Sequence, residues 1–408
     1  MSVISQVKSI FPESCRPNLW LVGGTVRDLL QGQPVQDIDL VAALSPDQLT
    51  SCGFRPVDPV SSAPIWFRHI PAIGKVEITR LTAADQLADD LVRRDFTVNA
   101  LAMTLNGEVV DLFNGQHDLK QRSLRVCSFQ SFHDDPIRIF RAFRFASAGW
   151  RILPETAQYI SEAGWEERLA TIPVERFSRE LIKALEKPDP ACFFTSMVSQ
   201  QVGRAYLPEL FRMQDVPAGP LQYHPEGDLL THVLQVMQRT AARTDDPLAR
   251  FCGLFHDLGK LSTDPALYPK HHGHDEAGFE PARQLCTRLR LPAAWQKALA
   301  WTCRLHTKAN NWDELRSSTR IRLAEQATKA GIAKILPLVS AADKPDGSGM
   351  AGWETVLQVL AMTTEQLGID QESFEQMPVH HRANHILHFR IGRLRQLLQA
   401  GQERVVNR

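Results

Sequence analysis

The feature that most constrains this chain is a change of sequence pattern near residue 125. Before that point, short β-rich segments alternate with helical stretches. Four segments are expected to be strands: 19–22, 37–41, 75–79 and 109–112. After it the pattern is helical, with prolines separating the helices. This order predicts an α+β chain, in which an α/β part is followed by all-α parts.

The length of 408 residues agrees with several domains, because a single core stops growing at about 250–300 residues. Residues 213–228 hold three prolines and two glycines and are the best candidate for a linker. We expect five regions, namely a head over 1–127, a helical neck and body over 128–212, a linker over 213–228, a histidine-rich helical domain over 229–345 and a helical tail over 346–408.

Composition excludes several broad classes of protein. The chain has 46 basic and 46 acidic residues, so any nucleic acid must be bound through a local basic surface. Its seven cysteines form no Cys-x-x-Cys pair, which is typical of reduced thiols. No apolar run is long enough to span a membrane, and the first residues do not resemble a secretory signal. We therefore expect a cytoplasmic protein with no membrane partner.

The head contains a glycine pair and a carboxylate pair. Gly23 and Gly24 separate an apolar run from a helical stretch, where backbone N–H groups can approach a phosphate and Arg27 can add a charged contact. Asp37 and Asp39 are two residues apart, so on a strand they share a face and suit Mg²⁺. Together they suggest metal-dependent nucleotidyl transfer. Taken alone, the glycine pair is more often a plain turn and the carboxylate pair more often a solvated strand end.

A series of arginines begins in the head and continues after it. Arg94 lies in the segment Arg-Arg-Asp-Phe-Thr-Val-Asn-Ala. Pro136 is expected at the first position of a helix, with Asp135 as the cap before it. Three arginines then recur at spacings of three, at Arg138, Arg141 and Arg144. Planar guanidinium groups can bind a phosphate or a base edge, although the same spacing also fits a solvated helix face.

Histidines and aspartates after the linker form a third group. Its members are His232, His256, Asp257, His274, His306 and Asp343. His256 and Asp257 are adjacent on one helix, and His271 competes with His274 for one place in the set. Imidazole and carboxylate ligands favour Mn²⁺, Ni²⁺, Co²⁺ or Mg²⁺ over a structural zinc site.

These segments carry a resemblance to a known family. The order Gly-Gly-x-Val-Arg-Asp, Asp-Ile-Asp-Leu, Arg-Arg-Asp-Phe-Thr-Val-Asn-Ala and Asp-Asp-Pro-Ile-Arg resembles the class II tRNA nucleotidyltransferase and bacterial poly(A) polymerase superfamily over residues 19–210. The segments 223–228 and 271–274 extend the likeness to the CCA-adding proteins of proteobacteria that contain an HD domain. The histidine and aspartate set itself resembles the HD phosphohydrolases.

The resemblance implies a polymerase-β-like head that adds C, C and A from CTP and ATP to the 3′ end of tRNA without a nucleic-acid template. DNA is not an implied partner. It also implies a metal-dependent phosphatase or 2′,3′-cyclic phosphodiesterase in the HD domain. The roles carried over to the head are triphosphate binding by Gly24 and Arg27, Mg²⁺ binding by Asp37 and Asp39, nucleotide contact by Arg94, a protein template at Asp135 and Arg138, and pocket lining by Arg141 and Arg144.

Two departures from the family keep alternatives open. The family usually has Glu-Asp where this chain has Asp134-Asp135, which keeps the charge but shortens one side chain. Only twelve residues separate Arg80 from Arg93, where complete CCA-adding enzymes usually carry a longer flexible loop. The alternatives are therefore a CC-adding enzyme, a poly(A) polymerase, and a phosphohydrolase with a vestigial head. The sequence does not identify the HD substrate or the HD metal.

Overall fold

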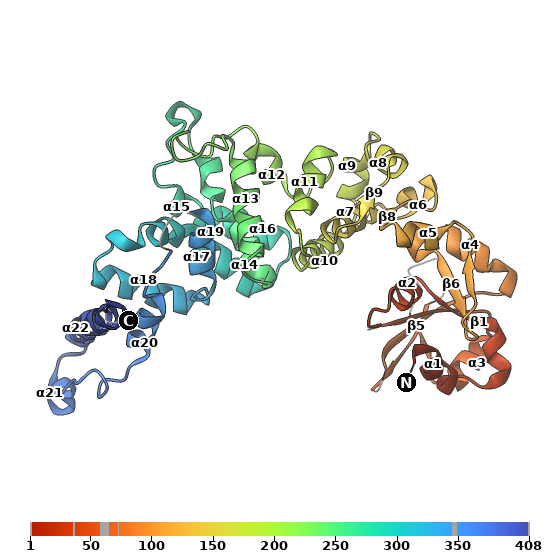
Figure 1. The fold of residues 1–408 in the computed structure, drawn as a ribbon, viewed down its shortest axis with the longest axis horizontal. Helices are drawn as coiled ribbons and strands as arrows, with labels where there is room; N and C mark the ends of the chain where they lie inside the picture. Colours follow the sequence, from red (N-terminus) through yellow and green to blue (C-terminus); the bar gives the residue numbers. More distant parts are fainter. Residues whose placement is uncertain (1, 36, 58–64, 72, 345–348, 407–408) are drawn as a thin grey trace. The chain divides into compact units, whose positions relative to one another are not determined.

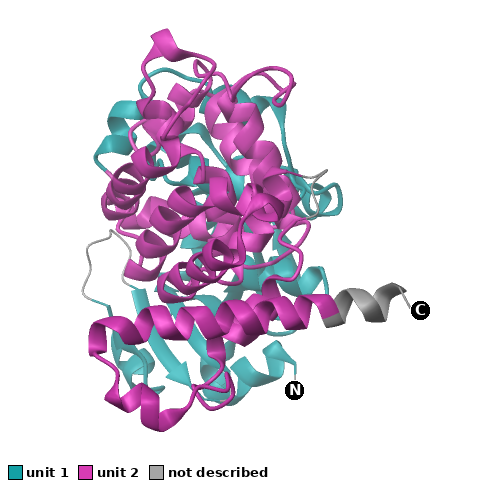
Figure 2. Ribbon diagram, turned by 90° about the vertical axis from the view of Figure 1, so that its left-hand side faces the viewer, with its two compact units in different colours: residues 1–171 teal, residues 172–408 magenta. Residues whose placement is uncertain are grey.

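The chain forms two units, residues 1–171 and 172–408, shown in different colours in Figure 2. The computed structural model describes residues 2–35, 37–57, 65–71, 73–344 and 349–406, with side chains to residue 399. Figure 1 follows the elements along the chain. The domain boundaries expected at residues 127, 212, 228 and 345 are finer than this division and stay a prediction.

The first unit contains a mixed seven-stranded sheet with the strand order β3-β4-β5-β2-β1-β6-β7. Its strands are β1 (Leu19–Val22), β2 (Ile38–Ala42), β3 (Arg55–Pro56), β4 (Ile65–Ile70), β5 (Gly74–Arg80), β6 (Leu101–Thr104) and β7 (Val109–Asp111). β2 and β5 run parallel, and the other neighbouring pairs are antiparallel. Four of the five residues of the central strand β2 are buried, and Asp39 is the half-buried exception.

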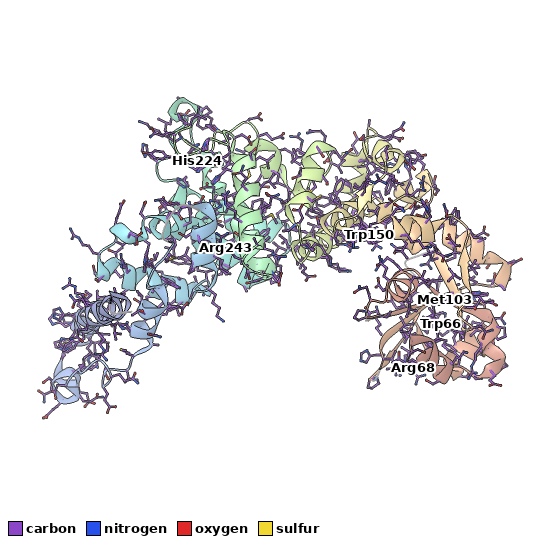
Figure 3. The ribbon with its side chains drawn as sticks, in the orientation of Figure 1. Trp66, Arg68, Met103, Trp150, His224 and Arg243 are labelled. Carbon is purple, nitrogen blue, oxygen red and sulfur yellow. The ribbon has the colours of Figure 1, made fainter. Side chains whose placement is uncertain are left out.

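The helices of the first unit lie before, between and after these strands along the chain. They are α1 (Val3–Ile10), α2 (Gly24–Leu30), α3 (Pro46–Ser51), α4 (Leu87–Val92), α5 (Gly115–Lys120), α6 (Phe129–Asp134), α7 (Arg138–Ser147), α8 (Pro154–Ile160) and α9 (Trp165–Ala170). Two short strands, β8 (Ser123–Leu124) and β9 (Arg151–Ile152), pair beside α7. In Figure 3, Trp66 and Met103 mark strands β4 and β6 of the sheet, and Trp150 marks the turn after α7.

The described residues of the second unit form helices joined by turns and loops, with one isolated antiparallel bridge between Pro217 and Asp228. Its α-helices are α10 (Val174–Leu185), α11 (Ala191–Ser199), α12 (Pro208–Met213), α13 (Leu229–Ala241), α14 (Pro247–Phe255), α15 (His274–Ala277), α16 (Phe279–Arg288), α17 (Ala293–Asn310), α18 (Ser317–Ala330), α19 (Ile335–Asp343), α20 (Trp353–Ala361), α21 (Gln371–Gln376) and α22 (Val379–Val406). Helices α13, α14, α17 and α19 pack against one another and form the centre of the unit. None of the described helices is both long and apolar enough to cross a membrane.

The predicted architecture is confirmed, with local corrections. The strands expected at 19–22, 75–79 and 109–112 are β1, β5 and β7, and the strand expected from residue 37 begins one residue later. Asp135 does not cap a helix that starts at Pro136. Instead Asp135 ends α6, where its N–H donates to the carbonyl of Ser131, so residues 136 and 137 form a turn and α7 begins at Arg138.

Candidate active sites

The glycine pair lies where β1 turns into α2. Gly23 has φ +64° and ψ −134°, a conformation that favours glycine. A Cβ atom on Gly23 would come within 2.8 Å of a guanidinium nitrogen of Arg94 and within 3.7 Å of a carboxylate oxygen of Asp39. The absence of a side chain at Gly23 therefore lets an arginine and a carboxylate approach the turn.

The carboxylate pair is held in place by a threonine of α2. The hydroxyl of Thr25 accepts a hydrogen bond of 2.8 Å from the N–H of Asp39 and donates one of 3.3 Å to the carbonyl of Asp37. Thr25 is buried, whereas the side chain of Asp37 is exposed. One hydroxyl thus fixes the backbone on both sides of Ile38 and sets where the two carboxylates emerge.

A third carboxylate lies beside the pair. The parallel pairing of β2 and β5 sets Glu77 opposite Asp39, and Lys75 forms an ion pair with Glu77. Burial raises the pKa of Asp39, and the negative charges of Glu77 and Asp37 raise it further, against the opposing charges of Arg94 and Lys75. Three acidic side chains on or next to two neighbouring central strands fit a hard divalent cation, which would relieve their repulsion.

A chain of polar contacts connects Arg27 to Arg141. A guanidinium nitrogen of Arg27 donates to Oδ1 of Asn99 at 2.7 Å, and Nδ2 of Asn99 donates to Oδ1 of Asp95 at 2.9 Å. The other oxygen of Asp95 lies 2.6 Å from Nη2 of Arg141. Burial alone would raise the pKa of Asp95, but the charge of Arg141 and the hydrogen bonds outweigh burial and lower it to about 2. Asp95 is therefore ionised and holds both amide and arginine in place.

The other predicted arginines of the first unit are also anchored. Arg94 forms an ion pair of 2.8 Å with Asp90. Arg138 donates from Nη1 to the carbonyl of Arg93 at 2.7 Å and to the hydroxyl of Ser131 at 2.7 Å. Two guanidinium groups, those of Arg27 and Arg144, lie over the ring of Phe145, at 5.4 and 4.9 Å from its centre.

The second unit brings all six predicted histidines and aspartates together. His232 comes from α13, His306 from α17, Asp343 from α19, and His256 and Asp257 from the junction between α14 and the 3₁₀ helix Leu258–Ser262. Asp257 is central, because its Oδ2 lies 3.4 Å from Nε2 of His232 and 3.3 Å from Nε2 of His256. Its Oδ1 lies 3.2 Å from Nε2 of both His274 and His306. Nε2 of His232 is also 3.0 Å from Asp343.

Each of the four imidazoles is oriented through its other nitrogen. Nδ1 of His256, His274 and His306 lies 2.7–2.9 Å from a backbone carbonyl, which accepts its hydrogen bond. Nδ1 of His232 lies 2.6 Å from Oε1 of Glu226. This arrangement makes each Nε2 face the carboxylates, and in metal sites an outer partner of this kind fixes the orientation of the ring. His271 instead bonds to Thr263 and to the carbonyl of Pro217, so the structure places His274 in the cluster.

Several buried polar atoms of the cluster are available to bind a metal ion. Nε2 of His232, Nε2 of His256 and Oδ1 of Asp257 are buried and have no hydrogen-bond partner among the described residues. Burial lowers the pKa of His232 and of His256, but Asp257 and Asp343 outweigh it and raise the pKa values to about 9 and about 10. These residues supply two sets of donor atoms close enough for a metal ion, namely His232 with His256 and Asp343, and His256 with Asp257 and His306.

A pocket of about 740 Å³ opens onto this cluster. Besides cluster residues, it is lined by polar side chains of α17, including Asn310, and by Pro220, Gln222, Tyr223 and His224. Lys260 reaches Oδ2 of Asp257 at 2.7 Å, and Asn310 donates from Nδ2 to Asp343 at 2.5 Å. The cluster is therefore accessible to a small molecule from one side.

The sequence patterns missed several residues of both sites. In the head, the predicted residues are contacted or flanked by Thr25, Glu77 and Asn99. In the second site, they are contacted by Glu226 and Lys260. Of these, Lys260 and Glu226 lie within recognisable segments, Phe-His-Asp-Leu-Gly-Lys and His-Pro-Glu-Gly-Asp, so their position next to predicted ligands was the available signal.

Comparison with known proteins supports two functional regions. Residues 19–59 and 67–125 match the Poly A polymerase head domain family, and residues 229–346 match the HD domain family. The Multifunctional CCA protein of Pasteurella multocida is 34% identical over 405 residues, covering 90% of this chain and 94% of that protein. The Multifunctional CCA protein of Methylococcus capsulatus is 37% identical over 358 residues, covering 82% and 83%.

Solved structures agree on the fold. A Thermotoga maritima CCA-adding enzyme complexed with tRNA aligns with a TM-score of 0.63 at 20% identity, covering 94% of this chain and 91% of the other. The Bacillus stearothermophilus CCA-adding enzyme in complex with CTP aligns with a TM-score of 0.62 at 21% identity, covering 100% of both chains.

The two regions define a nucleotidyltransferase that also carries an HD phosphohydrolase domain. Within that class, the chain belongs to the family of multifunctional CCA proteins, which are CCA-adding enzymes. The relatives favour CCA addition over the alternative of a poly(A) polymerase.

Proposed function

We propose that the head adds C, C and A to the 3′ end of tRNA, using CTP and ATP, and that the HD domain hydrolyses phosphate esters with a divalent metal. The 3′-hydroxyl of tRNA attacks the α-phosphate of the incoming nucleotide, and pyrophosphate leaves. The observation that carries the first activity is the group of three carboxylates beside the turn at Gly23. The structures bound to CTP, ATP and tRNA belong to relatives with the same fold.

In the head, Asp37 and Asp39 would hold Mg²⁺, with Glu77 adjacent. When bound, Mg²⁺ lowers the pKa of the attacking hydroxyl and stabilises the leaving pyrophosphate. The turn at Gly24 and the guanidinium groups of Arg27 and Arg94 bind the triphosphate, because they supply donors and positive charge next to these carboxylates. Thr25 keeps the carboxylates in register with that turn.

Selection of the base is assigned to Asp135 and Arg138. An aspartate acceptor and an arginine donor together complement the edge of cytosine, and a rotation of the pair suits adenine. Arg141 is held by Asp95, which also fixes Asn99 and through it Arg27. We propose that this connected set, with Arg144, lines the nucleotide pocket and keeps the triphosphate and template residues at a constant separation.

In the HD domain, six residues would hold the metal: His232, His256, Asp257, His274, His306 and Asp343. A bound Mg²⁺, Mn²⁺, Ni²⁺ or Co²⁺ would supply an activated water for attack on a phosphate ester. Glu226 orients His232, and Lys260 contributes positive charge at Asp257, where a phosphate would approach.

The deciding experiment uses tRNA that lacks its 3′ CCA, incubated with Mg²⁺ and with CTP, ATP or both, followed by sequencing of the products. The proposal predicts C-C with CTP alone and C-C-A with both nucleotides. A long run of A added to many RNAs would replace it with poly(A) synthesis, and a complete lack of addition would support a vestigial head.

One observation favours a CC-adding enzyme as the second candidate. The short segment from Leu81 to Val92 is packed into the head, because Leu81, Leu87 and Leu91 are buried in one cluster with Val22 and Val41. A segment anchored in this way has little freedom to stabilise a second arrangement of the template. tRNA ending in C-C, supplied with ATP alone, separates the two. Efficient addition of one A supports complete CCA synthesis, and no addition supports the CC-adding alternative.

The template assignment predicts a loss of selectivity in Arg138→Ala. Removal of one bidentate base contact should reduce discrimination against UTP and GTP by about 1–3 kcal/mol, with a smaller effect on triphosphate affinity. Relative incorporation of the four nucleotides measures this. An unchanged preference for CTP and ATP would remove Arg138 from the template.

A further inference from the structure

The tip of the loop beside the HD pocket exposes two large apolar side chains. Leu221 and Tyr223 are 71% and 72% exposed, whereas most large apolar residues of the chain are buried. Tyr223 lines the pocket together with Pro220, Gln222 and His224, the last of which is labelled in Figure 3. An exposed aromatic ring at the opening of a polar pocket is typical of a binding surface.

This tip is held firmly on the domain. The N–H groups of Tyr223 and His224 both donate to the carbonyl of Pro220, at 2.9 and 3.0 Å, and close a tight turn. The base of the loop is fixed by Lys260, which donates to the carbonyl of Ala218 at 2.6 Å, and by His271, which donates to the carbonyl of Pro217 at 2.8 Å. Tyr223 is therefore presented at the pocket by an ordered backbone, which lowers the entropic cost of binding.

Another lining residue of the pocket, Asn310, holds a hydrogen-bond acceptor that is unpaired among the described residues. Nδ2 of Asn310 is used by Asp343, whereas Oδ1 of Asn310 is buried and has no hydrogen-bond partner in the described part of the chain. A carbonyl oxygen accepts from a hydroxyl or an amine and does not bind a phosphate. The pocket is thus suited to a ligand that has an aromatic ring and donor groups besides its phosphate.

We propose that Tyr223 is a stacking platform for the base of a nucleoside phosphate, whose ester reaches the histidine and aspartate cluster while a donor of the nucleoside bonds to Asn310. This inference rests on the proposed phosphohydrolase function of the HD domain and assigns a residue that determines its specificity. The pocket volume of about 740 Å³ accommodates one nucleotide. Because every base has an aromatic face, the platform favours nucleotides over other phosphate esters without selecting one base.

The test compares two substrates that differ only in the base. Full-length enzyme loaded with Ni²⁺ or Mn²⁺ is assayed with uridine 2′,3′-cyclic phosphate and with methyl riboside 2,3-cyclic phosphate, which has no base. Tyr223→Ala should raise KM for the uridine compound roughly 5- to 150-fold with little change in kcat. KM for the base-free compound should stay the same, and Tyr223→Trp should behave like the wild type. Val379→Ala, at a residue 77% exposed and outside the pocket lining, is the matched control.

The outcomes separate this inference from the function on which it rests. If the wild type hydrolyses both substrates and Tyr223→Ala does not change either KM, the platform is wrong while the phosphohydrolase stands. If no metal supports hydrolysis, the phosphohydrolase is wrong, and calorimetric titration with uridine 3′-phosphate still decides whether Tyr223→Ala weakens binding of the nucleotide. Equal affinity in that titration overturns the platform and favours a protein-binding role for the exposed tip.

The source of the nucleoside is decided by a third substrate. An oligoribonucleotide ending in a 2′,3′-cyclic phosphate is compared with the mononucleotide in the same variants. A KM increase with the oligonucleotide alone supports an RNA end on the platform, and an increase with the mononucleotide alone supports a free nucleotide.

Discussion

The head and the HD domain arrange acidic residues in opposite ways. In the HD domain the central carboxylate, Asp257, is 2% exposed and surrounded by imidazoles that are already oriented. In the head, Asp37 is exposed and Asp39 is half-buried, with like charges as near neighbours. Under the proposed functions, the ligands of a permanently bound metal can be buried and oriented before the substrate arrives. A site that must admit a triphosphate and an RNA end has to leave its carboxylates accessible.

The largest expected effect is a loss of nucleotide addition without a loss of phosphatase activity, which would show that the two sites work independently. Asp39→Ala should lower nucleotide addition by about a thousandfold or more, because it removes one of two proposed Mg²⁺ ligands. Incorporation of labelled CTP into tRNA lacking its CCA end measures the loss. Phosphatase activity of the same preparation is the control and should be unchanged. Addition at the wild-type rate would remove Asp39 from the metal site.

The converse variant should affect only the HD domain. Asp257→Ala removes the carboxylate shared by all four imidazoles, so the purified protein should lose its bound metal and its phosphatase activity. Metal content after gel filtration and CTP incorporation are measured together. Asp257→Asn, which keeps the shape, guards against a folding defect. Wild-type metal content in both variants would show that the cluster is structural.

A smaller effect is expected from the outer partner of His232. Glu226→Gln replaces a charged acceptor of the Nδ1 proton by a neutral one and should weaken metal affinity roughly 10- to 100-fold. Competition with a chelator measures the affinity. Glu280→Gln, at an exposed carboxylate of α16, serves as the matched control. If the two variants bind metal equally well, His232 is held in place by packing.

The smallest effect concerns the stability of the head at low pH. The pKa of Asp95 is lowered to about 2, so its ionised form stabilises the fold above the ordinary value of 3.8, and that contribution is lost as the pH falls through 2. Asp95→Asn should therefore cost about 2 kcal/mol at pH 7, and the difference from the wild type should shrink between pH 4 and pH 2.

Thermal unfolding across this pH range, followed in the full chain, provides the measurement for Asp95. Asp89→Asn changes a nearby exposed carboxylate and should show no such dependence. A gap between Asp95→Asn and the wild type that stays constant down to pH 2 would mean that Asp95 is not ionised.

The site residues that the sequence predicted are those that lie close together in short motifs. Asp37 and Asp39 share a strand pattern, and His256 and Asp257 are adjacent. The parts that it missed depend on contacts between distant segments. Glu77 lies beside Asp39 only because β2 and β5 pair in parallel, and Asn99 meets Arg27 across 72 positions.

In two places the residue types of a short segment suggested a different structure from the one observed. Asp135 and Pro136 have the residue types of a helix start. However, the N–H of Asp135 donates to the carbonyl of Ser131 in the last turn of α6, and α7 begins only at Arg138. Glu226 lies in a segment whose prolines and glycines indicated a linker, although its carboxylate orients His232. In both cases a neighbouring element, which pattern reading treats as separate, determined the outcome.

The crowding of Asp37, Asp39 and Glu77 has a consequence for how the head is maintained. Residues that repel one another when ionised make the folded state less stable than a variant with a neutral side chain at the same place. Repulsion among these carboxylates thus lowers the stability of the folded head at the proposed site. A bound cation would restore that stability. Under the proposed function, a divalent cation bound at these carboxylates would then stabilise the folded head as well as take part in the reaction.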